Sequence, residues 1–239
     1  MRKIKFDVGG IYHVYNRGVE KRDIFLSDGD RWRFLQGMYL FNDENSSFRL
    51  LWNLEHRRGE LNFKVLKEIV RNQKTARKPL VKIMADCLMP NHYHFLIQEI
   101  KEGGISRFMH KLGVGYTNYF NKKYKRVGSL FQGTFKAVPV DQDAYLQYLL
   151  AYINVINPGQ LLEPELKERG TKNVVGILKF AEEFLWSTNK EYLGTRDSIV
   201  IDKGVAGEFF GTPTVYKAFV RNVLLGKKRF TGTDDLLID

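Results

Sequence analysis

Cysteine is almost absent from this sequence, because Cys87 is the only one among 239 residues. A disulfide within the chain is therefore excluded, and so is a zinc site built mainly from cysteines. No run of eighteen apolar residues occurs, and no apolar stretch of signal-peptide length follows the basic start of the chain. Internal repeats and low-complexity tracts are also lacking. From these absences we expect a soluble protein of the reducing cytoplasm.

Charge is unevenly distributed along the chain. The 38 Lys and Arg residues outnumber the 27 Asp and Glu residues, which gives a net charge of +11, while 44% hydrophobic residues are enough for a core. Residues 159–239 contain both signs in equal number, so the whole basic excess lies in residues 1–158. Residues 101–140 hold eight basic side chains and one acidic side chain. This concentration predicts a polyanionic partner such as nucleic acid.

Hydrophobic periodicity and turn residues predict alternating strands and helices. Strands are predicted at residues 10–15, 81–88 and 92–99, with an extended segment at 131–140. Helices are predicted from about 30 to 41, from 61 to 70, from 105 to 120, and from a cap at Asp141 or Asp143 to Ile153. Turns are predicted at Asn16-Arg17-Gly18, at Pro90-Asn91, and at Asn157-Pro158-Gly159, where the last helix should stop. The order predicts an α+β fold with an antiparallel sheet covered by helices.

A domain boundary is predicted between Pro158 and Pro164. Residues 1–158 would form the main domain, and residues 159–239 a small, mainly helical accessory region. Within the accessory region, the spacing predicts helices at 174–184 and 213–225 and a turn at Trp186-Ser187.

The most informative motif is His92-Tyr93-His94. Residues i and i+2 of a strand point to the same face, so His92 and His94 can present two imidazoles to one metal ion while Tyr93 points the other way. Two histidines at this spacing also arise by chance in surfaces and cores. The surrounding sequence must therefore decide between a chelate and two ordinary histidines.

The surrounding sequence supports the chelate. The run Cys87-Leu88-Met89-Pro90-Asn91-His92-Tyr93-His94-Phe95-Leu96-Ile97 resembles the metal-binding strand of the single-tyrosine HUH transposases of small bacterial insertion sequences, and most closely their REP-associated tyrosine relatives. Further segments resemble the same family in the same order: Tyr12 to Gly18, Gly128 to Gly133 with Phe135-Lys136, the helix from Asp143 to Pro158, and Trp186-Ser187 with Tyr192-Leu193-Gly194. Together they span about residues 8–194.

The resemblance implies a ferredoxin-like (RRM-like) sheet and a DNA-cutting activity. In the family, the histidine pair binds a divalent cation, here expected to be Mg²⁺ or Mn²⁺, which polarises the scissile phosphate. A tyrosine attacks the phosphorus and leaves a 5′-phosphotyrosine link and a free 3′-OH. The expected function is thus a transposase or single-strand endonuclease that cleaves and rejoins DNA. Its partner would be single-stranded DNA with a hairpin or palindromic repeat. The protein would be a monomer or homodimer associated with the nucleoid.

The catalytic tyrosine and the third metal ligand are assigned from the same resemblance. Counted without gaps from Leu130-Phe131, the family's tyrosine falls on Tyr152, with Tyr148 as the second candidate. The family usually has an Asn or Gln four residues later, but position 156 is Ile and the nearest amide is Asn157. Either a one-residue helical bulge brings Asn157 to the metal, or another group substitutes, or the enzyme is impaired.

Contacts to DNA are predicted for Arg17 and for the basic cluster of Lys122, Lys123, Lys125 and Arg126, where neighbouring aromatic rings offer stacking faces for unpaired bases. His13 should lie on the strand beside His92 and His94, where packing is the simpler role and contact with the site the alternative.

Two other functions are compatible with the sequence. One is a catalytically inactive nucleic-acid-binding protein on the same fold, which predicts no polar third ligand near the histidine pair. The other is an unrelated metallohydrolase, which predicts a third histidine or a carboxylate there and no tyrosine within reach.

Overall fold

A computed structural model describes residues 4–45, 63–71 and 76–226 of the chain. Its central feature is an antiparallel sheet with the strand order β2-β3-β1-β4. The strands are β1 (Ile11–Arg17), β2 (Val81–Met89), β3 (His92–Glu99) and β4 (Lys136–Pro139). One helical connection lies between β1 and β2 and another between β3 and β4, so the order is that of a ferredoxin-like fold. The predicted α+β class is confirmed.

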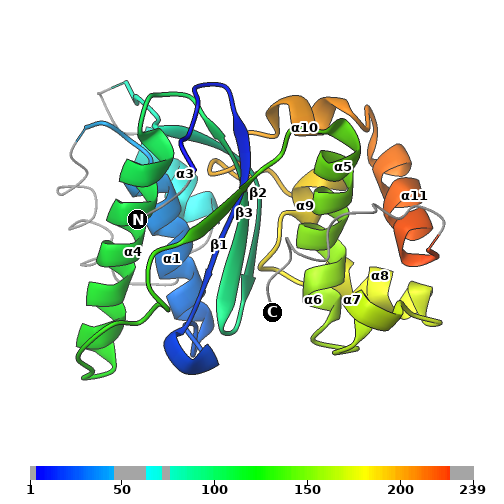
Figure 1. The fold of residues 1–239 in the computed structure, drawn as a ribbon, viewed down its shortest axis with the longest axis horizontal. Helices are drawn as coiled ribbons and strands as arrows, with labels where there is room; N and C mark the ends of the chain where they lie inside the picture. Colours follow the sequence, from blue (N-terminus) through cyan, green and yellow to red (C-terminus); the bar gives the residue numbers. More distant parts are fainter. Residues whose placement is uncertain (1–3, 46–62, 72–75, 227–239) are drawn as a thin grey trace.

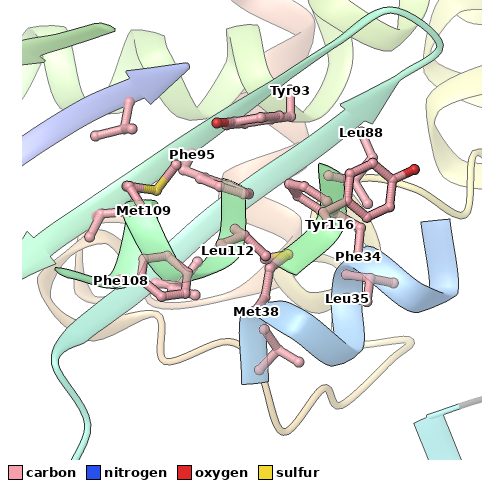
Figure 2. Packing of buried hydrophobic residues seen from close by; sticks show 14 of the residues in the cluster. Phe34, Leu35, Met38, Leu88, Tyr93, Phe95, Phe108, Met109, Leu112 and Tyr116 are labelled. Atoms are coloured by element: carbon pink, nitrogen blue, oxygen red, sulfur yellow. The ribbon is translucent and has the colours of Figure 1, made fainter. Parts of the chain in front are cut away.

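One face of the sheet is covered by α1 (Asp28–Phe41) and α4 (Gly104–Lys123), as Figures 1 and 2 show. Phe34 of α1, Phe95 of β3 and Phe108 of α4 are fully buried together. The 3-10 helix η1 (Val19–Lys21) precedes α1, and α3 (Phe63–Arg71) follows it and adds Leu66 to this core. The predicted helix start at residue 61 lies outside the described residues.

Local sequence explains how α1 and α4 form and pack. Ser27 caps α1 in a capping box with Asp30, whose carboxylate accepts from the backbone N–H of Ser27 at 2.9 Å. Gly115 lowers the helix propensity of α4, yet a Cβ at this position would lie 2.6 Å from the Phe41 ring. The glycine therefore lets the two helices approach closely.

The other face of the sheet carries the helices that follow β4, as Figure 1 shows on the side opposite α1 and α4. Leu96 of β3 lies in one buried cluster with Leu149, Ile177 and Val220 from three of these helices. The segments are α5 (Asp143–Ala151), a π-helical segment (Tyr152–Ile156), α6 (Asn157–Gly159), α7 (Leu166–Arg169), α8 (Val174–Glu183), α9 (Asn189–Tyr192), α10 (Gly204–Glu208) and α11 (Pro213–Leu224). None of the described helices has the length and apolar character needed to cross a bilayer.

The predicted domain boundary falls inside α6. Residues on both sides of it contribute to the same buried cluster, since Leu149 and Ile153 precede the boundary and Ile177 and Val220 follow it. The division into residues 1–158 and 159–239 stays a prediction.

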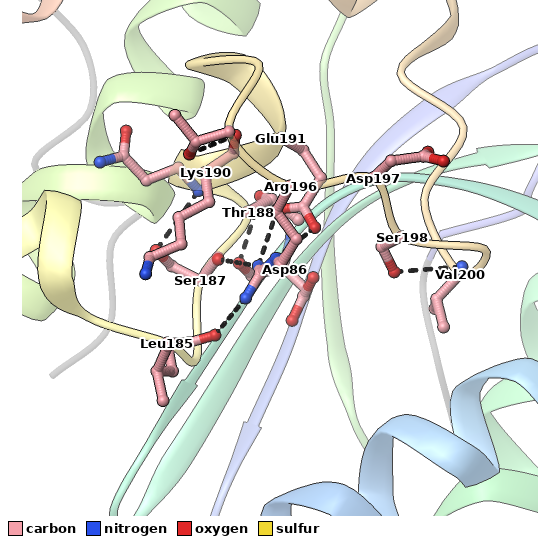
Figure 3. A network of polar contacts seen from close by, with 12 residues as sticks. Asp86, Leu185, Ser187, Thr188, Lys190, Glu191, Arg196, Asp197, Ser198 and Val200 are labelled. Carbon is pink, nitrogen blue, oxygen red and sulfur yellow. Dashed lines mark hydrogen bonds and ion pairs between the residues drawn. The ribbon is translucent and has the colours of Figure 1, made fainter. Parts of the chain in front are cut away.

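A polar network attaches residues 185–196 to β2, as Figure 3 shows. Arg196 binds both carboxylate oxygens of Glu191, at 2.5 and 2.7 Å, and donates to the carbonyls of Leu185 and Ser187. The predicted turn at Trp186-Ser187 is present, and Ser187 forms an isolated bridge with Cys87. The carboxyl of Asp86 is buried beside this network. Burial, and then the charge of Glu191, raises its pKa to about 7, while Arg196 acts in the opposite direction.

Several predicted boundaries were wrong. The first strand continues through Asn16 and Arg17 instead of turning there, because β1 pairs with β3 as far as Arg17 and His92. The extended segment at 131–140 is a strand only from Lys136 to Pro139, because Gly133 adopts a positive φ of 74°. The N-cap of α5 is Gln142, without a side-chain bond, and neither Asp141 nor Asp143.

The predicted helix stop at Asn157-Pro158-Gly159 is confirmed at its last residue, because the helical path runs through Asn157 and Pro158 and ends at Gly159. Proline at 158 has no N–H to donate to the carbonyl of Asn154. The hydroxyl of Ser187 donates to that carbonyl instead, at 3.4 Å. A partner from a later segment thus compensates for the missing backbone bond.

Candidate active site

A cavity of about 260 Å³ opens where the C-terminal end of β1 and the start of β3 meet the helices of the second face. All the predicted metal ligands and the predicted nucleophile line it, namely His92, His94, Asn157 and Tyr152. The other lining residues are Tyr15, Asn16, Arg17, Lys21, Met89, Asn91, Tyr93, Gln132, Lys136, Gln160 and Leu161. Residues far apart in the sequence therefore meet at one opening.

His92 begins β3, immediately after the turn, and its ring is held by Asn91. The Nδ2 of Asn91 donates to the carbonyl of Lys21 at 3.2 Å, so the Oδ1 of Asn91 faces His92 Nδ1, 2.6 Å away. An amide oxygen only accepts, so a neutral His92 donates from Nδ1 and keeps its lone pair on Nε2. That lone pair is directed toward Asn157 Oδ1 at 3.2 Å.

His94 lies two residues further along the strand and is 1% exposed. Its Nδ1 lies 2.8 Å from Nε2 of His13, which is itself fully buried on β1. Burial lowers the pKa of His94 well below its usual value, and His13 and His92 act in the same direction. Burial lowers the pKa of His13 to about 3. Both shifts favour neutral imidazoles. His13 is packed in the interior and reaches the site only through its contact with His94, because it does not line the cavity.

Tyr152 and Asn157 are brought together by the π-helical segment. The N–H of Asn157 bonds to the carbonyl of Tyr152, five residues earlier. In an α-helix of about 3.6 residues per turn, positions five apart lie on nearly opposite sides, whereas a π turn aligns them. The predicted one-residue bulge is therefore present. The Tyr152 ring is 5.4 Å from that of His94 between centroids, edge to face.

The donor atoms have the type and spacing that a divalent cation takes. Nε2 of His92 and Oδ1 of Asn157 are two acceptors 3.2 Å apart, and two ligands on adjacent positions of an octahedral ion at about 2.1 Å lie about 3.0 Å apart. The buried Nε2 of His94 has no hydrogen-bond partner among the described residues. No group of three His, Cys, Asp or Glu side chains suited to a metal occurs in the described part of the chain.

Comparison with known proteins finds one family model that matches this chain. Residues 43–155 match the model of the IS200-like transposases. This segment of the chain is therefore similar to the IS200-like transposases. The match contains His92, His94 and Tyr152 and ends two residues before Asn157. It confirms the resemblance drawn from the sequence.

One solved structure is also similar to this chain. A solved structure of a REP-associated tyrosine transposase bound to a REP hairpin is similar to it, with 12% sequence identity and a TM-score of 0.45 over 84% of this chain and 96% of that chain. No curated protein matches the chain.

Basic side chains lie among the residues that line the cavity. Arg17 donates from Nε to Oε1 of Gln132 at 2.5 Å, while Lys21 and Lys136 are exposed. No carboxylate is among the lining residues of this cavity in the described ranges. The rim therefore suits a phosphate backbone.

The predicted basic cluster lies elsewhere in the fold. It is formed by the last turn of α4 and the residues just after it, on the opposite face of the sheet, and its members do not line the cavity. Lys122 and Lys125 are exposed, Arg126 donates to Asn121, and Lys123 binds the buried Asp30 at 2.6 Å. Arg17 is thus the one predicted DNA contact that the fold brings to the site.

The other tyrosines differ in whether they line the cavity. Tyr116, Tyr119 and Tyr124 donate their hydroxyls to Ile24 or Asp30 inside the first face, and Tyr148 does not line the cavity. Tyr15 does line it, with its ring 5.7 Å from that of His94. The sequence analysis missed Tyr15, although strand periodicity puts it on the same face as His13. It also missed Lys21, Gln132 and Lys136 as site residues, although Gln132 and Lys136 lie in segments that resemble the family.

Proposed function

We propose that the chain is a metal-dependent DNA transposase and single-strand endonuclease. It would cleave and rejoin single-stranded DNA through a covalent link to Tyr152. The observation that carries this proposal is the convergence of His92, His94, Asn157 and Tyr152 on one basic-rimmed cavity. The similarity of residues 43–155 to the IS200-like transposases supports it.

The residues divide the work as follows. The Tyr152 hydroxyl attacks the phosphorus, forming the phosphotyrosine bond as the bond to the 3′-oxygen breaks. The phenol loses its proton, and the departing 3′-oxygen gains one. When bound by His92, His94 and Asn157, a Mg²⁺ or Mn²⁺ ion supplies Lewis-acid stabilisation of the charge on the phosphate, an effect worth several kcal/mol. The new bond keeps the energy of the phosphodiester, so a 3′-OH can reverse the reaction and rejoin DNA.

The substrate is proposed to be single-stranded DNA with a hairpin or palindromic repeat. Arg17, Lys21 and Lys136 would bind the backbone next to the scissile phosphate. The cluster at Lys122, Lys123, Lys125 and Arg126 would bind more distant phosphates, with Lys122 and Lys125 the most accessible. The similar REP-associated transposase was solved with a REP hairpin, which agrees with this substrate class.

The two alternatives have less support. An inactive binding protein predicted no polar third ligand, whereas Asn157 lies beside His92. A metallohydrolase predicted a third histidine or a carboxylate at the metal, but His13 contacts the far side of the His94 ring and does not line the cavity. Tyr152 also lies within reach of the pair.

The proposal is tested by covalent capture. The protein is incubated with end-labelled hairpin DNA and Mn²⁺ or Mg²⁺, and a labelled adduct that survives denaturation is sought. We expect the adduct with the wild type and with Tyr148→Phe and Tyr15→Phe, which are matched losses of a hydroxyl. It should vanish with Tyr152→Phe and with EDTA. An adduct formed by Tyr152→Phe would assign the nucleophile elsewhere. Tight binding without any adduct would favour the inactive binding protein.

A further inference from the structure

His13 differs from the other residues around the site because it is a polar side chain with no access to the cavity. It is fully buried in the middle of β1, and its ring lies 5.0 Å from that of His94 at an interplanar angle of 18°. The neighbouring rings are Tyr15, at 5.0 Å, and Tyr152, at 6.4 Å. Burying an imidazole is costly unless its nitrogens are hydrogen-bonded, so the contact with His94 needs an explanation.

The 2.8 Å contact between His13 Nε2 and His94 Nδ1 admits two neutral arrangements, since one nitrogen must donate and the other accept. In the first, His94 carries its proton on Nδ1 and has a bare Nε2. In the second, His13 donates, and the proton of His94 lies on Nε2. Only the first arrangement leaves His94 able to bind a cation from the cavity side.

The arrangement at His92 supplies an internal comparison. There the orientation of Asn91 is fixed by its bond to the Lys21 carbonyl, so its Oδ1 accepts from Nδ1 of His92. His92 is thereby held with its lone pair on Nε2. Each histidine of the pair thus has its Nδ1 against a neighbour from outside the ligand set, Asn91 in one case and His13 in the other.

We propose that His13 is a positioning residue, which accepts the Nδ1 proton of His94 and so keeps the Nε2 lone pair directed at the metal position. The inference rests on the proposed metal-dependent function. A partner on the second ring nitrogen fixes both tautomer and ring orientation, and loss of such a partner typically weakens metal binding about 10–100-fold. His13 fills this role without adding a negative charge to a fully buried position.

The first test reads the tautomer directly and needs neither metal nor DNA. In the ¹⁵N-histidine-labelled full-length protein, long-range ¹H–¹⁵N correlations distinguish an Nδ1–H ring from an Nε2–H ring. We expect His94 to be the Nδ1–H tautomer in the wild type. An Nε2–H signal for His94 would overturn the proposal, whatever the protein does to DNA.

The second test measures Mn²⁺ affinity by calorimetry without DNA. His13→Phe should weaken binding at least about tenfold, whereas His13→Gln, which keeps an acceptor, should recover most of the affinity. Circular dichroism melting of both variants checks that they are folded. If His13→Phe is destabilised, His13→Leu, which also lacks an acceptor, takes its place in the comparison with His13→Gln. Equal affinity in the wild type and the folded non-accepting variants would overturn the role of His13. If the wild type binds no Mn²⁺, the result would instead contradict the proposed function. The ¹⁵N signals of His94 would still show which tautomer the ring adopts.

Discussion

Deleting Ile156 should convert the π turn between Tyr152 and Asn157 into an α-helical turn while keeping both side chains on one face. In an α-helix each residue advances by about 100°, so positions five apart differ by about 140° and positions four apart by about 40°. Tyr152 and Asn157 are five residues apart, and a π turn places them on the same face of the helix. After the deletion the amide would follow Tyr152 by four residues, and an ordinary α-helix would then be enough.

The magnitudes follow from burial and ligand geometry. Ile156 is 7% exposed and its aliphatic side chain makes no hydrogen bonds, so its loss costs roughly 1.5–3 kcal/mol of folding stability, which the more regular helix partly offsets. The Mn²⁺ affinity of the deletion variant should stay within about threefold of the wild type, or roughly 0.7 kcal/mol. Asn157→Ala should lose at least about tenfold, or roughly 1.4 kcal/mol.

The assay is calorimetric titration with Mn²⁺, accompanied by thermal melting and by adduct formation with hairpin DNA. Inserting one alanine after Ile156 is the matched control, because it moves the amide away from Tyr152 and should abolish tight binding. A folded deletion variant that binds Mn²⁺ as weakly as Asn157→Ala would refute the geometric argument.

Three further outcomes are expected. Because burial raises the pKa of Asp86 to about 7, the folded state keeps a proton that the unfolded state releases above about pH 4. The stability of the fold should therefore fall as the pH rises from about 4 to about 7. Asp86→Asn should flatten this pH dependence in thermal melts recorded from pH 5 to 8. Arg196→Met should lower the urea-derived stability by about 3 kcal/mol or more, because Glu191 then stays buried without its partner; an unchanged midpoint would contradict this. Lys125→Met should reduce the slope of log affinity for hairpin DNA against log salt by about 0.9, and an unchanged slope would remove this residue from the DNA surface.

The order of strands and helices could be predicted because their signals are local. Alternating apolar residues define β1 and β3, Pro90-Asn91 defines the hairpin, and the capping box at Ser27 starts α1. The relation of His92 to His94 follows from the two-residue period of a strand, which is why the pair was found without a structure.

The rest of the site depends on contacts between distant segments. No local rule shows that Pro158 can continue a helix, since this depends on Ser187 reaching the carbonyl of Asn154. The rim lysines at 21 and 136 come from the ends of separate elements and meet only through the pairing of β1 with β4. Likewise, the pairing of Lys123 with Asp30 joins two helices and reduces the accessible charge of the basic cluster.

The side chain of Asn154, in the middle of the π-helical segment, has a consequence for how copies of the protein relate to one another. Its Oδ1 accepts from Thr188 at 2.6 Å, and its Nδ2 donates to the Tyr216 hydroxyl, which in turn donates to Asn189. The segment that carries Tyr152 is thus bound from behind by the last third of the chain. Moving this segment into a second copy of the chain would break these hydrogen bonds. We therefore propose that each copy uses its own Tyr152, in which case adduct formation per copy should be independent of dilution.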